Sequence, residues 1–189
     1  MAAAQHAHNV ASAKTAAKFE VLTAEQARQV EAIAAQIIPT DDQPGAREAG
    51  VVYFIDRALK TFDSNSVPVY ERGLEKLNQL TRSKCPDART FADATDGQQQ
   101  ALLAELESEH VRGEDERRLG PENSGEFFQT IRLHTVLGFL VDPSAGGNRD
   151  YIGWKVVGRD PSESFSAPFG YYDKNYPGWA AAKVQVEKT

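Results

Sequence analysis

The chain has 189 residues, of which 41% are hydrophobic, so it is long enough to form one domain with a real core and too apolar to be disordered. Its net charge of −6, with both signs spread along the sequence and no basic stripe, argues against a nucleic-acid partner. No apolar run approaches the roughly 20 residues of a membrane span. The single cysteine, Cys85, excludes a disulfide within the chain and a multi-cysteine metal site.

Residues 1–18 are mostly small or polar. They contain neither the apolar stretch of a secretory signal nor a twin-arginine pair, so no signal peptide is visible. We therefore keep both a periplasmic and a cytoplasmic location open. Because little in residues 1–18 can bury surface, we expect them to form a flexible N-terminal segment.

The first predicted helix begins at Thr23. Thr23 and Gln26 have the spacing of a capping box, in which each side chain satisfies the other residue's backbone N–H. Apolar residues then follow at helical spacing until Pro39 stops the pattern. These residues are Val30, Ile33, Ala34 and Ile37.

Two more helices are predicted after a loop rich in Pro and Gly. One begins near Arg47, and we expect its apolar residues to form a buried face: Val51, Ile55, Ala58, Leu59 and Phe62. The other opens around Pro68, since the first turn of a helix does not need the N–H that Pro lacks. Its apolar residues are Tyr70, Leu74, Leu77 and Leu80.

The second half of the chain contains the strongest helical pattern. Thr95 and Gln98 form another candidate capping box, and an apolar helix follows it. A helix from about Glu126 to Leu140 is apolar on most sides, so we expect it at the centre of the core. Asp142-Pro143 ends it. The predicted fold class is all-α, with about five helices in one domain over residues 19–160 and an extended, aromatic-rich arm over residues 161–189.

Candidate catalytic and metal-binding residues are few. The histidines have no metal-binding spacing; they are His6, His8, His110 and His134. We interpret His134, in the middle of an apolar helix, as a satisfied core or interface histidine rather than a catalytic base. Asp41 and Asp42 fit the role of turn caps better than that of cation ligands, because no EF-hand spacing follows them.

The segment "DPSAGGNRDYIGWK", residues 142–155, is rich in turn-forming residues. It follows a helix rather than a strand, so it is not typical of a phosphate-binding loop. We expect Asp142 to cap or pair locally, and Gly146 and Gly147 to adopt positive φ, which Asn148 also tolerates. Arg149 and Asp150 could form a solvated pair, and Trp154 could fill the core; Arg149 and Trp154 would equally suit an interface anchor. Both interpretations stay open.

The C-terminal arm has five aromatic residues within eleven positions: Phe169, Tyr171, Tyr172, Tyr176 and Trp179. Together they present on the order of 1,000 Å² of surface, which has to be covered by this domain or by a partner. We favour the partner. The predicted partner interface thus consists of these five residues with Asn148, Arg149 and Trp154, and no catalytic, cofactor-binding or metal-ligating residue is predicted.

Two long blocks carry a resemblance to a known family. Residues 22–59, with "IPTDDQPGAREAG", and residues 127–158, with "DPSAGGNRDYIGWK", resemble the small subunit (subunit 3, or gamma) of gluconate 2-dehydrogenase and related membrane-associated flavoprotein dehydrogenases. The resemblance implies an all-helical accessory subunit without a cofactor of its own. Its partner would be a large FAD-containing catalytic subunit of the glucose-methanol-choline (GMC) oxidoreductase type, which oxidises a hydroxyl of a sugar, polyol or sugar acid.

The resemblance also implies further partners and roles. Electrons would pass from FAD to a c-type cytochrome subunit or another acceptor, and the small subunit would assist folding, stability and export of its partner. Many members supply a twin-arginine signal, and this chain shows no such pair near its start. Two alternatives stay open: an independent small enzyme with a pocket near His134, Asp142 and Arg149, and a transient chaperone.

Overall fold

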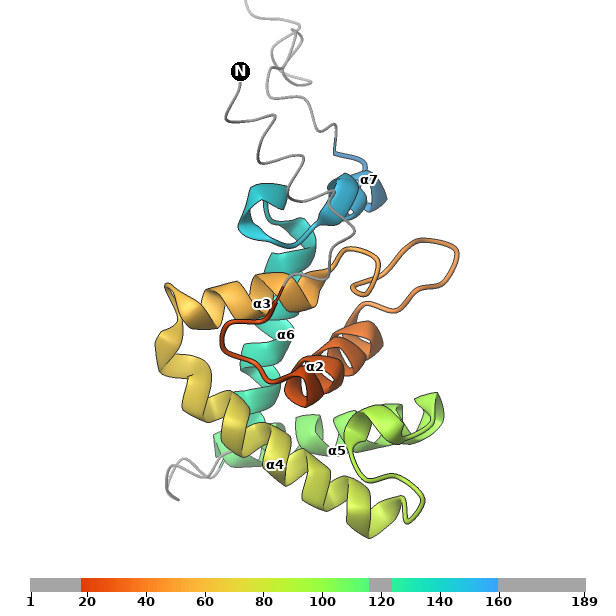
Figure 1. Cartoon of the computed structure of the whole chain (residues 1–189). Coiled ribbons are helices and arrows are strands. Elements are labelled where there is room, and N and C mark those ends of the chain that lie inside the picture. Colours follow the sequence, from red (N-terminus) through yellow and green to blue (C-terminus); the bar gives the residue numbers. More distant parts are fainter. Residues whose placement is uncertain (1–17, 116–123, 160–189) are drawn as a thin grey trace, which may run out of the picture. The chain divides into compact units, whose positions relative to one another are not determined.

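The computed structural model describes residues 18–115 and 124–159, with side chains described for all of them except 109–115 and 124 (Figure 1). These residues form helices and turns without any strand, which confirms the all-α prediction. The helices are α2 (Ala24–Ile37), α3 (Val51–Lys60), α4 (Val67–Lys84), α5 (Asp96–Asp115), α6 (Ser124–Leu140) and α7 (Ile152–Val156). Short 3-10 turns lie between them: η1 (Ser64–Ser66), η2 (Phe91–Asp93), η3 (Pro143–Ala145) and η4 (Arg149–Tyr151). The predicted arm, residues 161–189, and residues 1–17 lie outside the described residues.

Both predicted capping boxes are confirmed. At the start of α2 the backbone N–H of Thr23 donates to the side chain of Gln26 at 2.9 Å, and the N–H of Gln26 donates to the Thr23 hydroxyl at 3.2 Å. Thr95 and Gln98 exchange the same two bonds before α5, at 2.9 and 3.4 Å. These bonds satisfy N–H groups that have no partner within the helix.

Helix α3 departs from prediction at both of its ends. It begins at Val51 instead of near Arg47, because residues 46–50 form a turn that ends on Gly50 in the left-handed conformation, with φ 66°. At its other end the helix stops at Lys60, so Phe62 leaves the helical register. Phe62 is 69% exposed, and the prediction that it continues the buried face is wrong.

Helix α6 is the centre of the domain, as predicted. It contacts α2, α3, α4, α5 and α7, and Figure 1 shows it running behind α2, α3 and α4. Phe127, Ile131 and Phe139 lie on its buried face, where they pack with side chains from the surrounding helices. Its apolar character extends beyond the part that these neighbours cover, because a second face of α6 is exposed.

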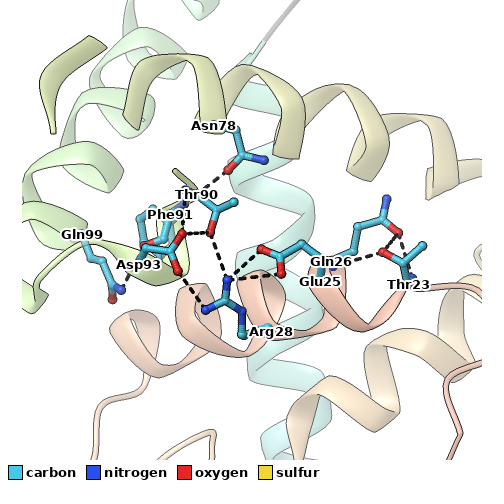
Figure 2. Close-up of polar contacts among 9 residues, drawn as sticks. All are labelled: Thr23, Glu25, Gln26, Arg28, Asn78, Thr90, Phe91, Asp93 and Gln99. Carbon is cyan, nitrogen blue, oxygen red and sulfur yellow. Dashed lines mark hydrogen bonds and ion pairs between the residues drawn. The ribbon is translucent and has the colours of Figure 1, made fainter. Parts of the chain in front are cut away.

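A polar cluster fixes η2 against three helices (Figure 2). The guanidinium of Arg28 on α2 binds the carboxylates of Glu25 and Asp93, each at 2.9 Å. Thr90 and Asp93 close a capping box around η2. The hydrogen bond from the Thr90 hydroxyl lowers the pKa of the Asp93 carboxyl, and the hydrogen bond from Arg28 lowers it to a smaller extent. Exposed ion pairs contribute little free energy. Their role here is positional, since η2 places the fully buried ring of Phe91 in the core.

A buried carboxylate ties the start of the domain to α3. Asp56 accepts three backbone N–H groups, those of Glu20 at 2.8 Å, Val21 at 3.0 Å and Leu22 at 2.8 Å. Hydrogen bonds to a charged acceptor are stronger than neutral ones, and three of them offset the cost of burying the carboxylate. The segment before α2 is therefore fixed by tertiary contacts.

Candidate partner-binding site

The segment that the sequence singled out, residues 142–155, packs at the C-terminal end of α6. It opens with Asp142, whose carboxylate accepts the N–H of Ser144 at 2.9 Å, so the predicted local cap is confirmed. Gly146 ends η3 with φ 105°, as predicted. The guanidinium of Arg57 on α3 donates to the Ser144 carbonyl at 2.8 Å, which joins this turn to the body of the domain.

Asn148 fastens the segment to α6. Its side chain donates to the carbonyl of Val141 at 2.8 Å and accepts the N–H of Gly153 at 2.7 Å, while its own N–H donates to the carbonyl of Gly138 at 2.9 Å. The residue is fully buried and its φ is 45°, as its tolerance for this conformation predicts. Both ends of the amide are thus used inside this chain.

The prediction of a positive φ at Gly147 is wrong: the glycines with positive φ in the described part of the chain are Gly50, Gly146 and Gly158. Gly147 is needed for close packing instead. A Cβ added at Gly147 would lie 2.1 Å from the carbonyl oxygen of Gly138. Real Cβ atoms do not approach a backbone oxygen so closely, so only glycine lets the segment lie against α6 here.

Trp154 packs on the same helix end. It is nearly buried, and its indole N–H donates to the carbonyl of Leu140 at 2.7 Å. The guanidinium carbon of Arg159 lies 3.8 Å from the centroid of its ring. These contacts fit the interpretation of Trp154 as a residue that fills the core.

Of the three predicted interface residues that the structure describes, Asn148 and Trp154 are buried and Arg149 is partly exposed. Its N–H donates to the carbonyl of Ala49 at 2.9 Å, and its guanidinium carbon lies 5.4 Å from the centroid of the Tyr53 ring. Tyr53 in turn stacks on Phe19 at 5.3 Å. Arg149 thus lies over an aromatic ring, and within the described segment it forms no ion pair with Asp150. The other predicted interface residues, from Phe169 to Trp179, lie outside the described residues.

Three residues in this segment that are not glycine have positive φ: 45° at Asn148, 54° at Asp150 and 59° at Tyr151. The left-handed conformation costs such residues roughly 1–2 kcal/mol each. Such a conformation is kept where surrounding contacts fix the backbone. Here the hydrogen bonds of Asn148 and Arg149 fix it.

His134 is a satisfied buried histidine, in agreement with its sequence interpretation. Its Nε2 lies 2.9 Å from the carboxylate of Asp63 and its Nδ1 lies 3.0 Å from the hydroxyl of Tyr70. Asp63 can only accept, so we assign the proton to Nε2, and Nδ1 then accepts from Tyr70. Burial raises the pKa of Tyr70 well above its usual value, which keeps this donor protonated. Burial also lowers the pKa of His134, against the opposing effect of Asp63, and so favours the neutral ring.

The structure does not gather the residues of the alternative small-enzyme pocket. His134 bonds to Asp63 and Tyr70, Asp142 to a backbone N–H two residues away, and Arg149 lies over Tyr53. Three different sets of contacts hold the three side chains.

Among the residues considered for metal binding, Asp41 and His134 make contacts within the domain. Asp41 accepts the N–H of Gln43 at 2.9 Å, which is a turn contact. In the described ranges, no group of three or more His, Cys, Asp or Glu residues could hold a metal ion. His6, His8 and the side chain of His110 lie outside those ranges.

An exposed apolar face of α6 was missed by the sequence analysis. Its members follow helical spacing i, i+3, i+4, i+7, and we call them the α6 stripe: Leu133, Val136, Leu137 and Leu140, exposed by 57%, 41%, 43% and 38%. The signal was present in the sequence, because a helix that is apolar on most sides carries more apolar residues than one core face uses. The other exposed large hydrophobic residues in the described part of the chain are Phe62, Val156 and Val157.

Comparison with known proteins identifies one family. A family model described as "Gluconate 2-dehydrogenase subunit 3" matches residues 24–161, which is most of the chain and includes α2 to α7. No curated protein and no solved structure matches the chain. None of the helices within residues 18–115 and 124–159 is long and apolar enough to cross a membrane.

Proposed function

Because the chain belongs to the gluconate 2-dehydrogenase subunit 3 family, we propose that it is a non-catalytic subunit that binds and stabilises the catalytic subunit of an FAD-dependent dehydrogenase complex. The catalytic partner would be of the GMC type and would oxidise a hydroxyl group of a sugar, polyol or sugar acid. Removal of hydride from such a carbon needs the flavin, which the partner would hold. A c-type cytochrome or another acceptor would receive the electrons.

The family match is the observation that carries this proposal, because the family is described as a subunit and the match spans every helix of the described domain. The contacts of the titratable side chains support it. Asp56 holds the segment before α2, His134 bridges Asp63 and Tyr70, and Asp142 caps η3. Each of these polar groups is engaged in holding this domain together.

Stabilisation of the partner would follow from mass action. A subunit that binds only the folded form of the catalytic chain lowers the free energy of that form, by about 2.7 kcal/mol when its concentration is 100 times the dissociation constant. The same effect would favour folding of the catalytic chain before export. We include assistance in folding and export in the proposed role.

The proposal is tested by purifying the tagged, full-length chain from its native host on a sizing column that records flavin absorbance. We expect it to elute together with a larger yellow protein, and the shared fraction to reduce an artificial electron acceptor when given a sugar or sugar acid. A colourless species at the chain's own 20.7 kDa, with no flavoprotein bound, would contradict the proposal. Activity of that lone species would favour the small-enzyme alternative.

A further inference from the structure

We propose that the α6 stripe is the surface that binds the catalytic subunit, an inference that rests on the proposed function. The stripe comprises Leu133, Val136, Leu137 and Leu140 on two successive turns of α6. Its occupant would be an apolar face of the FAD-containing chain. Four aliphatic side chains at this spacing form the kind of ridge that packs against a helix or another apolar surface.

The stripe lies opposite the part of α6 that the domain already uses. Phe127, Ile131 and Phe139 face the neighbouring helices and are buried, as is His134. The exposed residues alternate with these along the same turns. Folding of this chain therefore accounts for one apolar face of α6 and leaves the other without a role inside the described domain.

Another exposed apolar side chain lies on a segment that packs on α6 from the α3 side. Asp63 bonds to His134, and Phe54, in the first turn of α3, would meet a Cβ at Gly138 at 2.8 Å, so α3 and the segment after it pack on the buried face of α6. The exposed ring of Phe62 precedes Asp63 and lies 6.3 Å from that of Phe54. Phe62 therefore belongs to a segment that packs on α6.

Two further exposed apolar residues lie on α7 and just after it, at the C-terminal end of α6. Trp154 of α7 donates to the carbonyl of Leu140, the last residue of the stripe. Val156 and Val157, which follow Trp154, are both exposed. All seven exposed large hydrophobic residues of the described ranges thus belong to α6 or to segments that pack on it. Single exposed apolar residues are ordinary, whereas a contiguous group marks an interaction surface.

The charge of this region suits an apolar contact. Residues 124–159 contain four Lys or Arg and three Asp or Glu, whereas residues 18–115 contain 11 and 18. The core of a protein interface is depleted of charge and its rim is polar. The exposed residue Arg132 precedes the first residue of the stripe, and the exposed residue Lys155 precedes Val156 and Val157; both are suited to acidic groups at the rim of the partner's face.

The surface is also fixed before any partner binds. The last carbonyls of a helix have no partner within it. At α6 the carbonyl of Gly138 accepts from the N–H of Asn148, that of Leu140 from Trp154, and that of Val141, just beyond the helix, from the Asn148 side chain. A rigid surface loses less conformational entropy on binding, which increases affinity. This assigns to residues 142–154 the task of holding the end of α6.

The test uses the full-length chain in its native host with a photoreactive benzophenone amino acid placed at position 137. The control carries it at position 101, where Ala101 is exposed on α5. After illumination, tagged adducts are purified, assayed for flavin and for dehydrogenase activity, and mapped by mass spectrometry. We expect an adduct between position 137 and a flavin-containing chain, and at least about a tenfold lower yield from position 101.

A matched pair of variants measures the same contact by affinity. The double variant Leu133→Asp/Leu137→Asp should weaken binding to the flavoprotein by at least about tenfold, while Ala101→Asp should not change it. Circular dichroism checks that both variants are folded, and Leu133→Ala/Leu137→Ala provides a second, uncharged test.

The outcomes separate this inference from the proposed function. A flavoprotein complex that forms with the wild-type chain, is unaffected by the stripe variants and cross-links only from position 101 would overturn the inference and leave the function standing. Cross-links from position 137 that join two copies of this chain, or that return to the same chain, would also overturn it. If the wild-type chain binds no flavoprotein, the proposed function itself fails.

Discussion

The two faces of α6 contain the same kinds of residue, but one face is buried and the other is exposed. Ile131 and Phe127 are buried by the surrounding helices, whereas Leu133 and Leu137, on neighbouring positions of the same turns, remain exposed. Composition alone does not separate these faces, since both are aliphatic or aromatic. What separates them is the number of helices available to cover α6, and the uncovered face identifies where a partner would bind.

The largest expected effect lies on the buried face. Phe127→Ala should lower the free energy of unfolding by about 3–5 kcal/mol, because it removes a buried ring and leaves a cavity between α6 and α4. The ring packs edge-on against Tyr70, with centroids 5.6 Å apart. Urea unfolding followed by circular dichroism measures the change. A loss below about 1 kcal/mol would show that this face is not the core.

The next effect concerns the loop that holds the end of α6. Asn148→Ala should cost about 2–4 kcal/mol, because it leaves the Val141 carbonyl and the Gly153 N–H without partners and places Ala at positive φ. Asn148→Gly removes the same two bonds without the backbone strain, and should cost about 1–2 kcal/mol less than Ala. Equal losses in the two variants would argue against strain at this position.

A smaller, pH-dependent effect comes from His134. Burial lowers its pKa below the ordinary value of 6.5, so the unfolded chain binds a proton at a higher pH than the folded chain does. Stability from the neutral ring is therefore fully present above pH 6.5 and decreases as the pH falls below it.

The measurement that checks this is urea unfolding at a series of pH values from about 7 down to 5, comparing the wild-type chain with His134→Gln. The wild type should lose more stability than the variant over this window, because Gln does not titrate. Parallel curves for the two chains would show that the ring between Asp63 and Tyr70 has the same proton affinity in both states.

The smallest effect is expected on the exposed face of α6. Leu133→Ala should change the free energy of unfolding by no more than about 0.5 kcal/mol, since the side chain has few contacts to lose. The same substitution should weaken the complex with the catalytic subunit. Phe127→Ala and Leu133→Ala therefore form a pair on one helix: the first is expected to lower the free energy of unfolding, and the second to weaken the complex. A loss above about 2 kcal/mol in the isolated chain would place Leu133 in the core instead.

Local signals predicted the parts of the fold that depend on neighbouring residues. The capping boxes at Thr23 and Thr95 were predicted because their hydrogen bonds span three residues. The turn at Gly146 and the cap at Asp142 were predicted for the same reason. The central place of α6 followed from its apolar character.

The errors concern how far a helix extends and which surfaces pack together. Gly147 is required by the backbone of Gly138, and the exposure of Phe62 depends on where α3 stops. The α6 stripe could be counted in the sequence, but deciding which apolar face stays exposed requires the positions of the other helices. For the same reason, whether Trp154 packs within this domain or against a partner could not be predicted from the sequence.

The three hydrogen bonds to Asp56 also determine how a pulling force would enter the domain. A force applied to the backbone at Glu20 passes to α3, where one carboxylate holds three successive N–H groups. Helix α2 begins only after this anchor, so its capping box is shielded from the load. A load at Glu20 is therefore borne by α3 before it reaches α2.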